Sequence, residues 1–356
     1  MKPSLFASRL IAAREMACLT MQELADKSNL SKQAISKFEN GQLNPSEEAI
    51  FKLAKALNLN PDFFYKEDYI DLELKLASVS LREKKKVVSE EFEIIKRDTI
   101  EYVFRLIELE RIANCKNDFK NPIEDFIIKT LSDIKLAIKI LRKKWNLGNV
   151  QISNVVGLLE SKGILVYQVN RSENFEGLSA WAGKMPIIVI NSAIKKVTRI
   201  RFTALHELGH ILLNFFEEVD EEQKEKLCDA FSGEILFPNE VIVVEIGAKR
   251  TNISIEELRY LKEKYGISIL AIIYATYRAN VIDLETYHKW KKNYEDWYKK
   301  NEDFGKYISN EEPQRFNNLL MNCLVEEKIS YGKAASLAKI PESILKRKFH
   351  LLGEEI

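Results

Sequence analysis

The spacing of apolar residues along the chain predicts a mostly helical protein with one small sheet. Over residues 1–65 the apolar positions recur at helical spacing in short segments, which predicts five short helices. Further along, apolar or nearly apolar residues alternate at intervals of four and three (Val88, Phe92, Ile95, Thr99, Tyr102, Leu106, Leu109, Ala113). This pattern predicts a long helix with a narrow seam, which either joins two copies of the chain as a homodimer or packs inside its own monomer.

Continuous apolar runs in the second half predict the strands of the sheet. Residues 163–169 and 185–191 have the composition of buried strands, and 177–183 fits a third strand between them. Pro122 is expected to open an amphipathic helix that ends near Leu147. Further helices are expected at about 199–213 and 221–236, twice within 254–280, and along the tail from 282.

Length and charge narrow the class of protein. A chain of 356 residues corresponds to two or three domains. Lys and Arg number 54 and Asp and Glu number 53, so any contact with DNA must come from local charge. The four cysteines are far apart, which argues against a disulfide framework and against a cysteine-rich zinc site. The sequence shows neither a secretory leader nor an apolar run long enough to span a membrane, so we expect a cytoplasmic protein.

Histidine is scarce in this chain, and two of the four histidines lie four residues apart, at His206 and His210. On a helix this spacing places both imidazoles on one face, where they can bind one zinc ion. Glu207 lies one step round, within reach of a metal-bound water, and is the predicted general base. The alternative interpretation is a pair of structural histidines beside an ion-paired glutamate.

A catalytic zinc site needs a third protein ligand and an open position. A carboxylate is expected here, and the candidates are the acidic residues just after the histidines (Glu217, Glu218, Asp220, Glu221, Glu222, Glu225, Asp229, Glu234). Glu225 is preferred because it lies on the same helical stripe as three less polar residues, while Glu221 and Asp229 remain alternatives. Asp229 could instead hydrogen-bond a ligating histidine and orient it.

The segment from Arg201 to Leu213, RFTALHELGHILL, resembles the signature of the ImmA/IrrE metallopeptidases, and the segment from Glu225 to Pro238, EKLCDAFSGEILFP, resembles their second motif. The resemblance covers about residues 122–280. It implies zinc bound by His206, His210 and Glu225, with Glu207 as base. Two departures, the order Ala204-Leu205 and the presence of Cys228 in place of the usual alanine, touch no implied ligand.

Near the N-terminus, a short helix is predicted between Ser31 and Gly41, which are residues typical of a helix start and a helix end. Its apolar residues would face inward, whereas its outward side chains could contact base edges and phosphates of double-stranded DNA (Lys32, Gln33, Ser36, Lys37). Residues 4–65 resemble the XRE-type helix-turn-helix of phage repressors. This resemblance implies that Lys32, Gln33 and Lys37 read bases and that Asn40 contacts phosphate. The alternative is a helical module for protein contacts.

Together these features predict an α+β fold class, mostly α with a small β-sheet. We expect a helix-turn-helix domain, a linker with the long helix, a zincin-like metallopeptidase domain and a helical tail (1–65, 66–120, 121–281, 282–356). The ImmA/IrrE resemblance implies that a repressor protein is cleaved in a stress or mobile-element response, and the helix-turn-helix resemblance implies binding to a double-stranded DNA operator. In this fusion the substrate could be a separate repressor, another copy of the chain or the chain's own linker. The alternatives are a non-catalytic transcription factor that senses a metal or ligand, and an antitoxin-like interaction protein.

Overall fold

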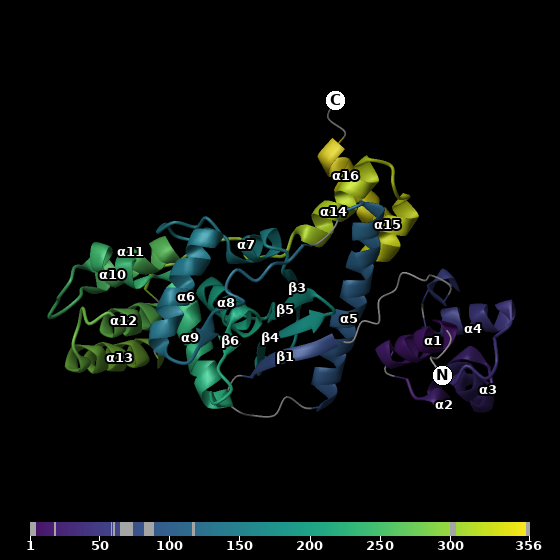
Figure 1. Cartoon of the computed structure of the whole chain (residues 1–356). Coiled ribbons are helices and arrows are strands. Elements are labelled where there is room, and N and C mark those ends of the chain that lie inside the picture. Colours follow the sequence, from purple (N-terminus) through teal and green to yellow (C-terminus); the bar gives the residue numbers. More distant parts are fainter. Residues whose placement is uncertain are drawn as a thin grey trace. The chain divides into compact units, whose positions relative to one another are not determined.

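The computed structural model describes residues 5–17, 19–57, 59, 61–64, 74–81, 89–115, 118–299 and 304–353. They form two compact units, one of residues 1–74 and 86–108 and the other of residues 75–85 and 109–356. The elements are mostly helices, with small sheets confined to the second unit, which confirms the predicted fold class (Figure 1). Within the described ranges, no helix combines the length and the apolar character that crossing a bilayer requires.

The first unit begins with α1 (Leu5–Met16), α2 (Met21–Ser28), α3 (Lys32–Glu39), α4 (Glu47–Leu57) and the 3₁₀ turn η1 (Pro61–Phe64). These are the five short segments that the sequence predicts. Thr20 and Glu23 form a reciprocal capping box at the start of α2, and the Ser31 hydroxyl accepts a hydrogen bond from the Ala34 amide at the start of α3. A core of small and branched apolar side chains joins the helices.

The long helix is α5 (Ser89–Ile112), which confirms the element predicted from the four-and-three alternation. The central residues of its seam are buried within one copy of the chain (Ile95, Thr99, Tyr102, Leu106, Leu109). Burial of these residues within one copy of the chain is what the monomer interpretation predicts, and the homodimer contact stays a prediction.

The larger sheet of the second unit has the strand order β1-β4-β5-β3. Three strands lie where the sequence predicts them, as β3 (Leu165–Val169), β4 (Phe175–Ala182) and β5 (Met185–Asn191). β5 pairs antiparallel with β4 and parallel with β3. The fourth strand, β1 (Leu74–Leu81), is an element that the sequence does not predict, and it lies in the region expected to hold the linker and the long helix (66–120). Residues 66–73 and 82–88 of that region lie outside the described residues.

Helices pack around this sheet, and two corrections apply to them. The helix expected from Pro122 begins only at α6 (Leu131–Lys144), after a short strand β2 (Ile127–Ile128) that pairs with β6 (Asn214–Phe215). The sequence does not predict the helix α10 (Asn239–Ile246), which follows Pro238. The remaining helices are α7 (Val155–Ser161), α8 (Val197–Leu212), α9 (Glu221–Leu236), α10 (Asn239–Ile246), α11 (Ile255–Tyr265), α12 (Ile269–Arg278), α13 (Leu284–Lys299), α14 (Arg315–Val325), α15 (Tyr331–Ala338) and α16 (Glu342–Gly353).

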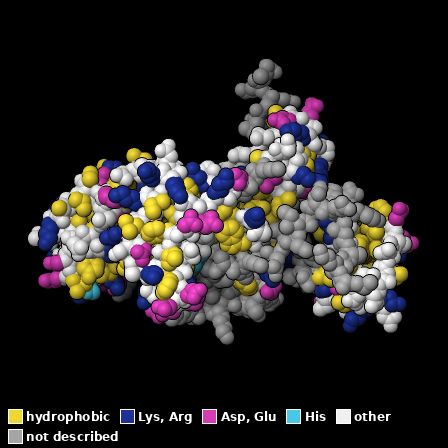
Figure 2. Space-filling model, viewed as in Figure 1, with side chains coloured by type: hydrophobic (Ala, Val, Ile, Leu, Met, Phe, Trp, Pro, Cys, Tyr) yellow, Lys and Arg dark blue, Asp and Glu magenta, His cyan; other side chains and the backbone are white. Residues whose placement is uncertain are grey.

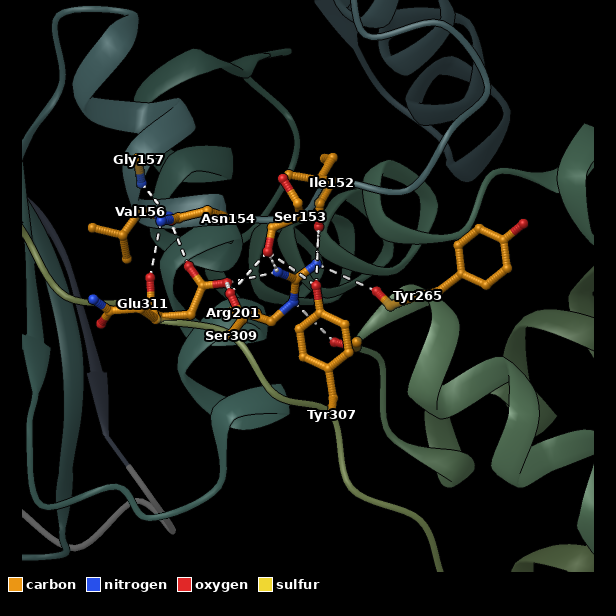
Figure 3. Close-up of polar contacts among 12 residues, drawn as sticks. Ile152, Ser153, Asn154, Val156, Gly157, Arg201, Tyr265, Tyr307, Ser309 and Glu311 are labelled. Carbon is orange, nitrogen blue, oxygen red and sulfur yellow. Dashed lines mark hydrogen bonds and ion pairs between the residues drawn. The ribbon is translucent and has the colours of Figure 1, made fainter.

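A buried ion pair fastens the tail of the chain to α8 (Figure 3). The Arg201 guanidinium is fully buried and donates to Glu311 at 2.6 Å and to the Ile152 carbonyl at 2.7 Å. Glu311 also accepts a hydrogen bond from the Val156 amide at 2.9 Å. The ring of Tyr307 covers the guanidinium, 4.6 Å from its centre. These contacts satisfy a charge that would otherwise be very costly to bury.

The Arg201–Glu311 pair is expected to matter far more for stability than a neighbouring pair on the same helix. Replacing Arg201 by Met leaves a buried carboxylate uncompensated and should lower the free energy of unfolding by about 3–5 kcal/mol. The matched control is Arg199→Met, because Arg199 pairs with Glu176 but its side chain is 51% exposed. That change should cost less than about 1 kcal/mol. Urea unfolding measures both, and equal losses would contradict the expectation.

Candidate metal centre

The two histidines predicted to bind metal lie on the same face of α8. Their side chains are each only 7% exposed, and their Nε2 atoms are 3.2 Å apart. The face of α8 that carries Leu205, Leu208 and Leu212 is buried in the core. Burial of that apolar face fixes the rotation of the helix about its axis, and therefore the direction in which the imidazoles point.

The third member of the cluster, Glu225, comes from α9 and is half-exposed. Its Oε2 lies 3.1 Å from His206 Nε2, and its Oε1 lies 3.2 Å from His210 Nε2. Among the described residues, this is the group of histidine, cysteine and acidic side chains whose ligand atoms lie close enough to hold one ion. The sequence predicts the same three residues.

The spacing of these atoms fits a tetrahedral ion. For zinc bound at about 2.0–2.1 Å, neighbouring ligand atoms of a tetrahedron are about 3.3 Å apart. The separation of 3.2 Å between the two Nε2 atoms is close to this value, and each of them also has one oxygen of Glu225 nearby, Oε2 at 3.1 Å from His206 and Oε1 at 3.2 Å from His210. Three protein ligands leave the fourth corner available to water or substrate. The donor set of two imidazoles and a carboxylate is one that zinc accepts.

A close approach between α8 and α9 brings the three residues together. A Cβ placed on Gly209 would lie only 3.0 Å from the Cys228 sulfur and 3.3 Å from the Cys228 Cα. Cys228 is fully buried at this contact. The absence of a side chain at Gly209 therefore permits the short distance between the helices that the cluster requires.

Asp229, one turn after Glu225, lies behind His206 rather than in the cluster. Its Oδ1 is 2.9 Å from His206 Nδ1, which is the contact that the predicted orienting role requires, and the role itself stays a prediction. Burial by itself would lower the pKa of His206, but the hydrogen bonds with Asp229 and Glu225 outweigh it and raise this pKa to about 10. The hydrogen bonds from His206 and His210 lower the pKa of Glu225 to about 2. Both shifts come from the short contacts between the imidazoles and the carboxylates of the cluster.

Glu207, the predicted base, is fully buried beside β4. A Cβ placed on Gly177 of β4 would lie 2.8 Å from Thr203 Cγ2 and 3.4 Å from Glu207 Cγ. The backbone of β4 therefore runs directly against the part of α8 that carries Glu207. This close approach depends on a glycine within a strand. The glycine is visible in the sequence, but the histidine motif on α8 does not point to it.

The other acidic candidates have different surroundings. Glu221, an alternative ligand, is exposed and pairs with Lys224 at 2.7 Å. Asp220 accepts a hydrogen bond from the Gln223 amide and caps the start of α9. Neither belongs to the cluster formed with the histidines.

A cavity of about 1080 Å³ adjoins the cluster on the side of Asp229. Its walls come mainly from α8, α9, α12 and α13 and include Glu234, Tyr274 and Arg278. Burial raises the pKa of Glu234. The sequence does not predict this cavity, because its lining is assembled from helices far apart in the chain.

The predicted DNA-contacting residues lie on one helix of the first unit. Lys32, Gln33 and Lys37 are exposed on α3, whereas Ser36 is half-buried. The Asn40 side chain donates to the Ser36 carbonyl at 2.8 Å, so it stabilises the end of α3 in addition to its predicted contact with phosphate. Charged side chains of both signs are scattered over the molecular face in Figure 2, so any DNA contact depends on such local groups.

Removal of Glu225 is expected to abolish tight zinc binding. Glu225→Ala should weaken the affinity by more than the roughly 10–100-fold that the loss of an outer hydrogen-bond partner costs. Glu221→Ala, four residues earlier on the same helix, is the matched control and should leave the affinity unchanged. Competition with a chromophoric chelator measures both affinities. Equal affinities for the two variants would contradict the assignment of Glu225.

Comparison with known proteins finds two families, each of which matches one segment of the chain. Residues 10–64 match the helix-turn-helix family, and residues 160–277 match the IrrE N-terminal-like domain. Among curated proteins there is no match to the chain. A crystal structure of ComR from Streptococcus suis is similar over 99% of this chain and 96% of its own, with 15% identity and a TM-score of 0.17.

Proposed function

Since the chain carries a helix-turn-helix domain and an IrrE N-terminal-like domain, we propose that it is a DNA-binding transcriptional regulator with a zinc-dependent endopeptidase. Its substrate would be a repressor protein or the chain itself, and cleavage would change gene expression in a stress or mobile-element response. One observation carries the enzymatic part of the proposal. Two imidazoles and a carboxylate converge at tetrahedral spacing, with a buried carboxylate, Glu207, next to the first of them in the sequence.

The side chains of α8 and α9 would have separate roles in peptide hydrolysis. His206, His210 and Glu225 would hold the zinc ion, which when bound polarises a carbonyl group and lowers the pKa of water. Glu207 accepts the proton of the attacking water and returns it to the leaving amine. Asp229 accepts a hydrogen bond from His206 Nδ1, which keeps the lone pair of Nε2 directed at the cluster.

Replacing Glu207 by Gln should separate catalysis from metal binding. The amide cannot accept the proton, so cleavage of a repressor substrate should fall by at least about 100-fold. Zinc content should stay that of the wild type, because Glu207 is not in the ligand cluster. Gel analysis of cleavage and metal analysis of the purified protein test the two expectations. Full cleavage activity in this variant would contradict the role of Glu207.

One observation favours a second candidate function, a non-catalytic regulator whose peptidase-like domain senses a ligand. The cavity of about 1080 Å³ is large enough for a drug-sized molecule, and Asp229 in its wall connects it to His206. Under this alternative, regulation in cells would survive the Glu207→Gln change, whereas loss of regulation together with cleavage supports the peptidase.

The DNA-binding part of the proposal places α3 in the major groove of an operator. The N-terminal residues of a recognition helix contact base edges, and α3 exposes Lys32, Gln33 and Lys37. Phosphate contacts near Asn40 would fix the position of the helix on the duplex without reading sequence.

Two lysines of the first unit provide a matched test of this orientation. Lys37→Ala on α3 should weaken operator binding by about 1–3 kcal/mol, which is roughly tenfold or more. Lys52→Ala is the control, because Lys52 lies on α4 and pairs with Glu48 at 2.8 Å. Its removal should change the affinity little. Fluorescence anisotropy at a fixed salt concentration measures both, and a larger effect at Lys52 would contradict the assignment of α3.

A further inference from the structure

We propose that β1 of the chain's own linker, which lies as a strand beside β4, is a substrate that the peptidase site cleaves within the same molecule. This inference rests on the proposed peptidase function. It names the substrate and the way in which that substrate is presented.

The topology of the sheet places β1 at the position where a strand can be added. β5 occupies one edge of β4 through antiparallel pairs such as Gly177↔Ile190. β1 occupies the other edge and is the outermost strand of the sheet. Figure 1 shows β1 running alongside β4 at the rim of the sheet. β1 is also the strand that comes from outside the region that matches the IrrE N-terminal-like domain, residues 160–277.

The strand to which β1 is added is also the strand that contacts the predicted base. At Gly177, the backbone of β4 approaches Glu207 so closely that an added Cβ would lie 3.4 Å from Glu207 Cγ. Neighbouring strands lie about 4.8 Å apart. A strand beside β4, on the side away from β5, therefore lies one strand spacing from the backbone of β4. An extended peptide at that edge is therefore brought to the neighbourhood of Glu207.

Strand addition suits a peptidase because it recognises the main chain. Backbone hydrogen bonds supply the affinity and hold the peptide extended, whatever its side chains are. β1 forms such a pairing with β4 while it remains covalently part of the chain. A tethered strand has a high effective concentration, so it binds ahead of a free peptide of similar affinity.

The position of β1 in the chain gives the cleavage a consequence. β1 lies between η1, which ends at Phe64, and α5, which begins at Ser89. Hydrolysis here breaks one amide C–N bond and adds one water molecule across it, which leaves a new carboxylate and a new amine. The product is an N-terminal fragment that contains α3 but none of the metal-binding residues.

The test begins with the full chain loaded with zinc. We expect an N-terminal fragment whose new end, identified by mass spectrometry, lies within or next to residues 74–81. The rate should be first order and independent of protein concentration, because the reaction is intramolecular. Glu207→Gln should slow it by at least about 100-fold.

A pair of adjacent proline substitutions tests the pairing with β4. Alternate amides of an edge strand point toward the neighbouring strand or away from it, so Ala77→Pro and Ser78→Pro remove amides that point in opposite directions. One variant should slow self-cleavage roughly five- to tenfold through the loss of a ladder hydrogen bond, and the other should have a smaller effect. Each serves as the folding control for the other, and both should still cleave an unstructured peptide added in trans.

The outcomes separate this inference from the proposed function. Cleavage of an added peptide without self-cleavage would show that β1 blocks the site, and would overturn the inference alone. Self-cleavage outside the neighbourhood of residues 74–81, or equal rates for the two proline variants, would also overturn it. Absence of all cleavage, with zinc bound, would overturn the proposed peptidase as well.

Discussion

The candidate metal centre depends on the close packing of α8 against α9 at Gly209 and Cys228. His206 and His210 come from one helix and Glu225 from the other, so the distance between the helices sets the size of the site. A methyl group at Gly209 would press against Cys228, so this part of α9 would have to give way by a few tenths of an ångström. A shift of about 1 Å would be enough to disturb a coordination sphere whose bond lengths vary by only about 0.2 Å. The packing of α8 against α9 thus sets the spacing of the three side chains that would bind the metal ion.

Much of the site follows from the sequence because its signals are local. His206, Glu207 and His210 lie within one helical turn or so, and α9 has the bounds that its pattern of apolar residues predicts. Asp229 follows Glu225 by four residues, so its orientation toward the same helix is also a local matter. These positions depend on helical periodicity, which a single sequence records directly.

The features that the sequence does not reveal are those made by distant partners. β1 carries a short alternation of apolar and polar residues over 77–81, but its partner β4 lies about 100 residues later, so the sequence does not show what this strand pairs with. The partner of Arg201 is equally remote, because Glu311 follows it by 110 residues. The expected helix does not begin at Pro122 for a related reason, since residues 122–125 form a turn and the pairing of β2 with β6 holds Ile127 and Ile128 extended.

The Arg201–Glu311 pair has a consequence for how much of the chain can exist independently. The family match ends at residue 277, yet the acid that neutralises the most deeply buried arginine of α8 lies beyond it. A fragment that stops at the end of the matched region would keep the guanidinium in a place without water and without its counter-charge. The recognisable peptidase-like segment is therefore expected to be less stable without the part of the tail that carries Glu311. Proteolytic trimming of the tail would act on the integrity of the helix that carries the histidines, at a distance from them.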